Sequence, residues 1–360
     1  MEYIKKLNNP KLVEGLLKEI SYNKRPIKIM EVCGTHTMSI WKNGIKELLP
    51  QNIELISGPG CPVCVTPKSY IDKAIELSKK DNIIITTFGD MIKVPGSNSS
   101  LKREKAFGRD IRIVLSPLDS IKIAKKNPKK EVIFLGVGFE TTAPIIALSI
   151  DIAEKENIKN YSILQGLKTM PNAIKTIIID PEINIDGFIY PGHVSTIIGV
   201  KPFYDLSKEI KIPGVVAGFQ YMDIIVAIYF LVKMINKKEG KVKNIYNRVV
   251  KYEGNKRALS MIDKIFTPSS SIWRGLGNIE NTGLILKKKY NSYNIESKLD
   301  IKEMKSKVNK DCLCGEILKG KRKPIECKLF VKICNPSNPI GPCMISREGS
   351  CGAYYTYGKI

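Results

Sequence analysis

The cysteines of this 360-residue chain fall into two groups that could each carry out thiol chemistry. Three of the nine cysteines lie in the first 64 residues, none lies in the next 247, and six lie in the last 49. Thiolates bind soft metals and iron–sulfur clusters, and paired thiols exchange with disulfides. A structural disulfide framework would be unusual in a cytosolic chain. The distribution therefore predicts two chemical sites.

The stretch "GPGCPVCVTP" (58–67) places Cys61 and Cys64 three residues apart after a Gly-Pro-Gly turn. This spacing suits either a redox disulfide or half of a zinc site. We expect Thr66 and Pro67 to begin a helix, so that the two cysteines lie just ahead of its N-terminus. A zinc ribbon needs a second Cys-x-x-Cys pair, and the chain has none. The pair is therefore predicted to be a redox couple.

Cys33 and His36 stand in "MEVCGTHT", where an apolar strand ends and a helix is predicted to begin. The positive end of the helix dipole would lower the thiol pKa and favour the thiolate. His36, one of only two histidines, is a candidate ligand or proton carrier. The alternative for Cys33 is a small buried apolar side chain.

Three further polar residues each follow a predicted strand. They are Asp90 in "FGDMIKVPG", Glu140 in "GVGFETTAP" and His193 in "YPGHVS". Ligands bind beyond the carboxyl ends of parallel strands, so these residues, Cys33 and the Cys61–Cys64 pair predict a cleft between two domains. Helix capping is the alternative for the two acids. The Gly-x-Gly before Glu140 lacks the third glycine of a dinucleotide site and the lysine of a phosphate loop.

The tail contains "CLCGE" (312–316) and then Cys327, Cys334, Cys343 and Cys351. Six cysteines at short, irregular intervals favour a thiolate-bound iron–sulfur cluster. Four thiolates hold a cubane, which would leave two cysteines for a dithiol beside it. A pair of zinc sites remains the alternative.

Short apolar strands alternate with helical stretches in the first two-thirds of the chain, which predicts parallel sheets covered by helices. The predicted strands are 27–33, 53–57, 82–88, 111–116, 131–137, 161–166, 185–191 and 213–219. The fold class is therefore α/β, with two similar parallel-sheet domains at 22–128 and 129–235. Residues 236–360 form a third, mainly helical or irregular iron–sulfur domain, on which residues 1–21 are expected to pack.

The composition is that of a folded protein, with 43% hydrophobic and 26% charged residues. The first residues lack the apolar region of a signal peptide, and the longest apolar run (224–235) is too short to span a bilayer. We therefore expect a cytoplasmic protein that does not bind membranes. The formal net charge of +23 invites a nucleic-acid interpretation, but the lysines are scattered and no recognition motif accompanies them. No nucleic-acid partner is expected.

The quoted motifs, with "WRGLG" (273–277) and the tail from Cys312 to Tyr355, together resemble the HypD family of hydrogenase maturation proteins. The resemblance runs in order over essentially the whole chain. It implies an assembly scaffold with redox chemistry, rather than a stand-alone metabolic enzyme. With a small HypC-like partner, such a scaffold assembles the Fe(CN)2CO unit of [NiFe] hydrogenase. A HypE-like protein donates the cyanide, and the hydrogenase large subunit is served indirectly.

The resemblance also implies roles for individual residues. Cys33 would be a thiolate ligand of the mononuclear iron that carries CN and CO, with His36 beside it. Cys61 and Cys64 would be a redox dithiol near that iron. A [4Fe-4S] cluster would be held by Cys312, Cys327, Cys334 and Cys351, with Cys314 and Cys343 as the adjacent dithiol. Asp90, Glu140 and His193 would be proton donors, groups that orient the ligands, or contacts for a partner.

Reducing equivalents could then pass from the tail to Cys61 and Cys64 by thiol exchange. Two other functions remain open. An iron–sulfur-dependent protein disulfide reductase would use the tail and the Cys61–Cys64 pair but would leave Cys33 and His36 without a role. A purely structural iron–sulfur adaptor would leave all the thiols inert.

Overall fold

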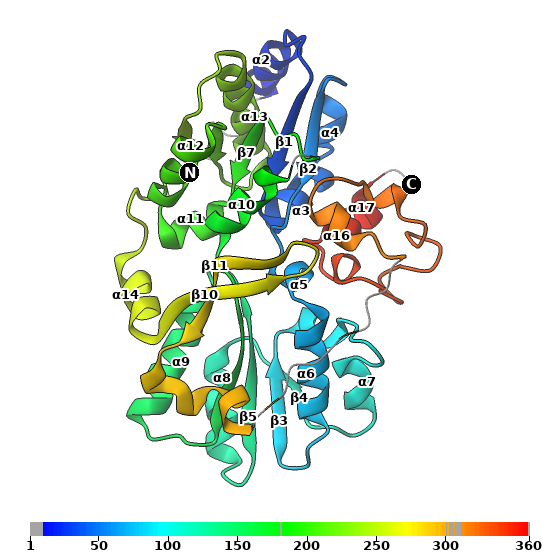
Figure 1. The fold of residues 1–360 in the computed structure, drawn as a ribbon. Coiled ribbons are helices and arrows are strands. Elements are labelled where there is room, and N and C mark those ends of the chain that lie inside the picture. The colour runs from blue at the N-terminus through cyan, green and yellow to red at the C-terminus, as the bar shows by residue number, and fades with distance from the viewer. Residues whose placement is uncertain (1–9, 181, 300, 302–305, 307–310, 359–360) are drawn as a thin grey trace.

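The chain builds two parallel β-sheets that lie one above the other along the long axis of the molecule (Figure 1). The computed structural model describes residues 10–180, 182–299, 301, 306 and 311–358. The first sheet, sheet A, has the strand order β2 (Ile53–Ser57), β1 (Ile27–Glu31), β7 (Gly187–Tyr190), β8 (Gly214–Val216) and β9 (Val242–Asn244). The second, sheet B, has the order β4 (Ile111–Ile113), β3 (Ile83–Thr87), β5 (Glu131–Gly138) and β6 (Tyr161–Leu167).

All eight predicted strands are present, and the α/β fold class is confirmed. The grouping of the strands differs from the prediction. The chain leaves sheet A after β2, builds sheet B without interruption, and then returns to add β7 next to β1. The predicted boundary between residues 128 and 129 therefore falls inside sheet B. Apolar runs mark where strands lie, but they do not encode which parallel strands pair.

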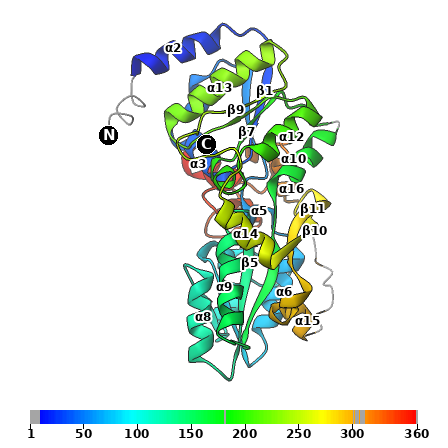
Figure 2. The same cartoon turned by 90° about the vertical axis from the view of Figure 1, so that its left-hand side faces the viewer.

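Both faces of each sheet are covered by helices, which explains why their strands are apolar on both sides. In sheet B, Ile84 packs among α8 (Pro117–Lys126) and α9 (Ala143–Lys155), whereas Ile83 and Ile85 face α6 (Lys68–Ser78) and α7 (Leu101–Ala106). In sheet A, Ile189 faces α13 (Tyr221–Asn236). The opposite face packs on α10 (Met170–Ile179) and α12 (Lys201–Ile210), as Figure 2 shows.

The N-terminal helix α2 (Pro10–Ser21) packs on α13, not on the C-terminal region as predicted. Its buried Ile20 joins the apolar core between sheet A and α13. α13 contains the apolar run 224–235, and this packing accounts for the hydrophobicity of the run. Among the described residues, no helix is long and apolar enough to cross a membrane.

The region after residue 236 contains less helix than predicted. It adds β9, then α14 (Lys256–Ile265), and then an antiparallel hairpin of β10 (Phe266–Trp273) and β11 (Gly277–Leu286). In Figure 1 this hairpin runs between the two sheets toward the C-terminal tail. Buried and less buried residues alternate along most of β10, but the flanking lysines and the serine run hide this pattern.

Candidate functional site

The six cysteines of the tail line one small, mainly apolar cavity. α16 (Cys314–Leu318), the turn Pro342–Met344 and α17 (Ser350–Tyr357) hold three of them in place. The rest of the lining consists of Ile317, Leu329, Phe330, Gly341 and Met344. Five of the six cysteines are buried, and Cys312 is half-buried. All nine cysteines of the chain are free thiols here.

The two cysteine groups, predicted as separate sites, form one continuous set. Within the tail, the thiols of Cys314, Cys343 and Cys351 line the same cavity and lie close enough to shift the pKa of Cys343. The Cys343 thiol and the Cys64 thiol also influence each other's pKa, as do those of Cys64 and Cys61, and Cys64 Sγ donates to the Pro342 carbonyl next to Cys343 (3.9 Å). This contact arises because the one-turn helix α5 (Pro62–Val65) packs on the turn Pro342–Met344. Thiol exchange between the groups would therefore need no large movement.

Most of these thiols are held in their protonated form. The neighbouring thiol of Cys343 lowers the pKa of Cys64, but the thiol of Cys61 and burial together raise it well above its usual value. Burial and neighbouring thiols act in the same way on Cys314, whose pKa is also raised. A metal or an oxidant must therefore displace these protons for the cysteines to react or to coordinate.

The donor set suits a cluster better than a single ion. No three His, Cys, Asp or Glu side chains among the described residues converge so as to hold one metal ion. In a cubane, each iron takes one thiolate, so the ligands surround the cluster at a distance rather than meet at a point. Six thiols around an apolar cavity provide that chemistry.

The hairpin and two glycines fix the Cys61–Cys64 turn. Arg274, at the hairpin tip, donates from its backbone N–H to the Val65 carbonyl (2.8 Å) and from Nε to the Thr66 carbonyl (2.9 Å). Gly275 of the same tip packs against Gly315 at the start of α16, with no room for a Cβ between them. The "WRGLG" motif therefore joins α5 to the cysteine cavity. Thr66 does not cap a helix as predicted: its hydroxyl donates to the Pro62 carbonyl, and α6 begins at Lys68.

Cys33 lies next to this turn, as the N-cap residue of α3 (Gly34–Lys42). The Gly34 N–H donates to the Gly60 carbonyl (3.0 Å). A Cβ on Gly60 would lie 2.3 Å from the Cys33 nitrogen, so only glycine fits there without a shift of the backbone. The strand ends of β1 and β2 thus bring the backbones of Cys33 and Cys61 together.

The thiol pKa of Cys33 is not lowered by the helix, contrary to the prediction. Burial and the nearby carboxylate of Glu348 raise its pKa to about 12, although the helix N–H groups of Thr35 and His36 lower it. Glu31 is also buried beside Cys33 and accepts from its backbone N–H (3.2 Å). Burial raises the pKa of Glu31 to about 8. The sequence analysis missed Glu31, inside an apolar strand, and Glu348, far away in the tail.

Both histidines flank one aromatic ring near Cys33. Phe219 lies 4.7 Å from the His36 ring and 4.0 Å from the His193 ring, measured between centroids. His36 bonds to the Gly218 carbonyl through Nε2 (2.8 Å), and burial lowers its pKa to about 4. It is therefore neutral, and its buried Nδ1 has no hydrogen-bond partner among the described residues.

A polar chain connects His193 with the tail. The Thr35 hydroxyl donates to Glu348 Oε1 (2.6 Å) and lies 3.5 Å from His193 Nδ1. Burial lowers the pKa of His193, although Glu348 opposes this effect. Residues from α3, α11 (Gly192–Ile198) and the tail therefore meet beside Cys33.

Glu140 and Asp90 lie apart from this group. Glu140 lines an apolar pocket with Ile198, Leu259 and Leu284. Burial raises its pKa to about 7, although the Met170 N–H donates to its Oε1 (2.8 Å). Asp90 is exposed in the 3-10 turn Gly89–Lys93. No hydrogen bond in the described part of the chain joins Glu140 or Asp90 to Cys33, His36 or His193. The hairpin contacts both Lys168, after β6, and the Cys61–Cys64 turn.

Comparison with known proteins gives a consistent picture. Residues 10–358 match the family described as HypD, the hydrogenase formation hypA family. Hydrogenase maturation factor HypD2 of Bradyrhizobium diazoefficiens is 42% identical, over 100% of this chain and 97% of its own length. Hydrogenase maturation factor HypD of Cupriavidus necator is 40% identical, over 100% of this chain and 98% of its own length. Hydrogenase maturation factor HypD of Rhizobium leguminosarum is 41% identical, over 100% of this chain and 96% of its own length.

Proposed function

This chain belongs to the HypD family of hydrogenase maturation factors, and from that premise we propose that it is the scaffold on which the Fe(CN)2CO unit is assembled. A HypC-like protein would share the iron, a HypE-like protein would donate cyanide, and the hydrogenase large subunit would receive the product indirectly. Cys33 would provide this chain's thiolate to the iron. The contact between Cys64 and Cys343 is the observation that supports this proposal most, because it links the tail to the turn that touches Cys33.

The residues around Cys33 suit the capture of a metal by a protonated thiol. Iron must displace a proton from a thiol whose pKa is about 12. Glu348 is an acceptor near that thiol, and Thr35 links it to His193. His36 is neutral and buried, so it would act by keeping the Cys33 turn in place rather than by carrying a proton. We propose that Glu348 and His193 carry the released proton away.

We propose that the tail provides reducing equivalents. Cys312, Cys327, Cys334 and Cys351 would hold a [4Fe-4S] cluster, which when bound supplies single electrons. Cys314 and Cys343 would form the dithiol beside it. When Cys61 and Cys64 form a disulfide, Cys343 attacks the sulfur of Cys64, and Cys61 leaves and takes up a proton. Cys314 then attacks Cys343 and releases Cys64. The pair Cys61–Cys64 gains two electrons, and a disulfide forms between Cys314 and Cys343.

The disulfide reductase is the weaker alternative. Cys61, Cys64, Cys314 and Cys343 are all at least 95% buried, so a disulfide on another protein cannot reach them without opening of the tail. The burial of these thiols favours an internal exchange that serves Cys33.

Infrared spectroscopy tests the scaffold function. The protein is purified anaerobically after co-expression with its small partner and the rest of the pathway, as wild type, Cys33→Ala and Cys351→Ala. We expect cyanide and carbonyl stretching bands in the wild type and none in Cys33→Ala. Cys351→Ala is the control that alters the tail. This variant should still bind the mononuclear iron at Cys33, even where fewer cyanide and carbonyl ligands are added to it. A wild type without these bands would contradict the scaffold function.

A trapping experiment tests the thiol exchange separately. In the double variant Cys61→Ser/Cys314→Ser, the thiols that would resolve a mixed disulfide are gone. Mild oxidation with diamide should then give a Cys64–Cys343 disulfide, detected by mass spectrometry of unreduced peptides. A disulfide between Cys64 and any other cysteine, or none at all, would refute the proposed route while leaving the role of Cys33 open.

A further inference from the structure

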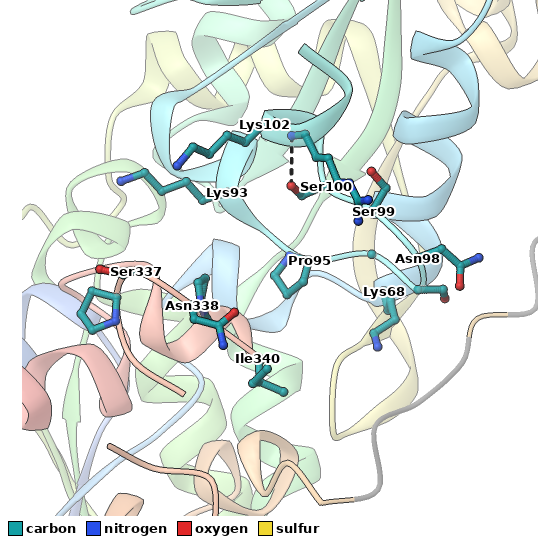
Figure 3. A pocket seen from close by; sticks show the side chains of 15 residues that line it. Lys68, Lys93, Pro95, Asn98, Ser99, Ser100, Lys102, Ser337, Asn338 and Ile340 are labelled. Atoms are coloured by element: carbon teal, nitrogen blue, oxygen red, sulfur yellow. Dashed lines mark hydrogen bonds between the residues drawn. The ribbon is translucent and has the colours of Figure 1, made fainter. Parts of the chain in front are cut away.

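A second cavity, of about 760 Å³, opens between the loop 93–103 and the tail loop 336–340 (Figure 3). Four cationic side chains line it: Lys68, Lys93, Lys102 and Arg103. The other polar lining residues carry hydroxyl or amide groups, and no carboxylate is among the described residues that line the cavity. Its size is typical of small-molecule sites, but its lining is polar and cationic. It therefore suits a hydrophilic anion.

Lys93 and Lys102 contribute two of the four positive charges that line the cavity. Figure 3 shows the Lys93 and Lys102 side chains extending in the same direction from the loop and from α7. Neither forms an ion pair with a described residue, although this chain has 21 such pairs among the described residues. Like charges that line one cavity repel each other, and an anion that enters the cavity relieves this repulsion. The cavity can therefore gain electrostatic free energy when an anion enters.

One wall of the cavity is held in place before any ligand arrives. The buried carboxylate of Asp72 accepts from the backbone N–H (2.6 Å) and the hydroxyl (2.7 Å) of Ser97. The Gly96 N–H donates to the Ser99 carbonyl (2.8 Å), and a Cβ on Gly96 would lie 2.5 Å from Asp72 Oδ1. The tight turn presents the exposed amide of Asn98 at the cavity rim.

The opposite wall belongs to the cysteine cavity as well. Asn335 Oδ1 accepts from the backbone N–H groups of Ser337 (3.0 Å) and Asn338 (2.9 Å), which shapes the loop. Two residues further on, the Ile340 N–H donates to Cys334 Sγ (3.3 Å). A ligand that holds Asn338 would therefore also restrain the backbone that hydrogen-bonds to this cysteine.

We propose that this cavity binds a phosphate-bearing anion, which bridges the loop 93–103 of sheet B and the tail loop 336–340. Lysine and arginine side chains together with hydroxyl and amide donors are the groups that recognise phosphate oxygens. An acidic protein segment offers similar charge, but a concave cavity walled by two loops suits a compact ligand better. The diphosphate of a nucleotide and inorganic pyrophosphate share the required chemistry.

Calorimetric titration of the anaerobically purified full-length protein with inorganic pyrophosphate tests the proposal. We expect binding that weakens as salt is added, and at least about tenfold weaker binding in Lys93→Ala/Lys102→Ala. Lys105→Ala removes one positive charge from the helix that contains Lys102 but outside the cavity, and it should bind as the wild type does. Parallel titrations with ADP and AMP distinguish a nucleotide from free diphosphate.

Amide hydrogen exchange gives a second measurement, because anions that bind loosely to a charged surface would not slow exchange in two particular loops. Pyrophosphate should slow exchange in both 97–103 and 337–341, and Asn338→Ala should abolish the effect on the second segment. Three results would each overturn the proposal: no binding at millimolar pyrophosphate, binding unchanged in Lys93→Ala/Lys102→Ala, or binding of an oligoglutamate peptide in place of pyrophosphate. The last would identify the cavity as a docking site for an acidic protein segment. None of these measurements needs iron or a partner, so they are independent of the scaffold function.

Discussion

Gly60 offers a direct test of how the Cys61–Cys64 turn positions Cys33. In Gly60→Ala the new Cβ would lie 2.3 Å from the nitrogen and 2.5 Å from the Cα of Cys33, and 2.6 Å from the carbonyl carbon of Val32. All three are backbone atoms, so the clash can be removed only if the two strand ends separate. A separation of about 1 Å would bring the 2.3 Å distance between the new Cβ and the Cys33 nitrogen to that of an ordinary van der Waals contact. Overpacking of this kind typically costs 1–3 kcal/mol. We expect about 3 kcal/mol, since no flexible side chain can move away.

Local destabilisation of that size should open the Cys33 turn far more often. A cost of about 3 kcal/mol raises the open population by about 100-fold, because each 1.4 kcal/mol is a factor of ten. Cys33 is only 7% exposed, so alkylation by iodoacetamide depends on this opening. Peptide-resolved mass spectrometry should therefore show alkylation of Cys33 about 100-fold faster in Gly60→Ala.

The matched control is Gly15→Ala in α2, where an added Cβ meets nothing within 4 Å. This variant should be slightly more stable than the wild type, since alanine favours a helix over glycine, and its Cys33 should react at the wild-type rate. The infrared bands of the iron unit should be reduced in Gly60→Ala alone. Equal alkylation rates in Gly60→Ala and wild type would refute the idea that this contact positions Cys33.

Two further predictions concern residues outside the Cys33 turn. In the folded protein Glu140 keeps its proton up to about pH 7, whereas in the unfolded chain it releases the proton near pH 4.5. The contribution of Glu140 to the free energy of unfolding is therefore complete below pH 4.5 and is lost as the pH rises to 7. Glu140→Gln should therefore gain up to about 3 kcal/mol relative to wild type over this range in denaturant titrations, and a constant difference would contradict the assignment. Arg274→Ala removes the Nε bond to the Thr66 carbonyl, worth about 1.5–3 kcal/mol for a charged donor, and should speed alkylation of Cys64 at least about tenfold. Arg274→Lys should not restore protection, because an ammonium lacks the planar donor geometry, and full protection in this variant would argue against that explanation.

The strands could be predicted because each is a short apolar run between turn residues. The site residues could be predicted because they follow those strands, at the carboxyl ends where ligands bind. Cys33, Cys61 and Cys64 do meet at the ends of β1 and β2, as this reasoning expects. The pairing of β7 with β1 could not be predicted, since both are short, mainly apolar runs that contain no mark of their neighbour.

The contact of Cys64 with Cys343 joins residues 279 positions apart and has no local signal. The same holds for Glu348, which approaches Cys33 only because α17 packs on α3. The pKa of Cys33 shows the limit of a local rule most clearly. A helix N-terminus lowers a thiol pKa in solvent, but here burial and two carboxylates outweigh it.

The interleaved order of the two sheets has a consequence for synthesis on the ribosome. β1 and β2 emerge first, yet their partner β7 begins at residue 187, about 130 residues after β2 ends. At roughly 5–20 residues per second, the interval lasts on the order of 10 s. During it, β3 to β6 emerge in one stretch and can complete sheet B, while one edge of β1 waits without a partner. The tail comes last, so the nascent chain can gather its cysteines only after every strand of both sheets has been synthesised.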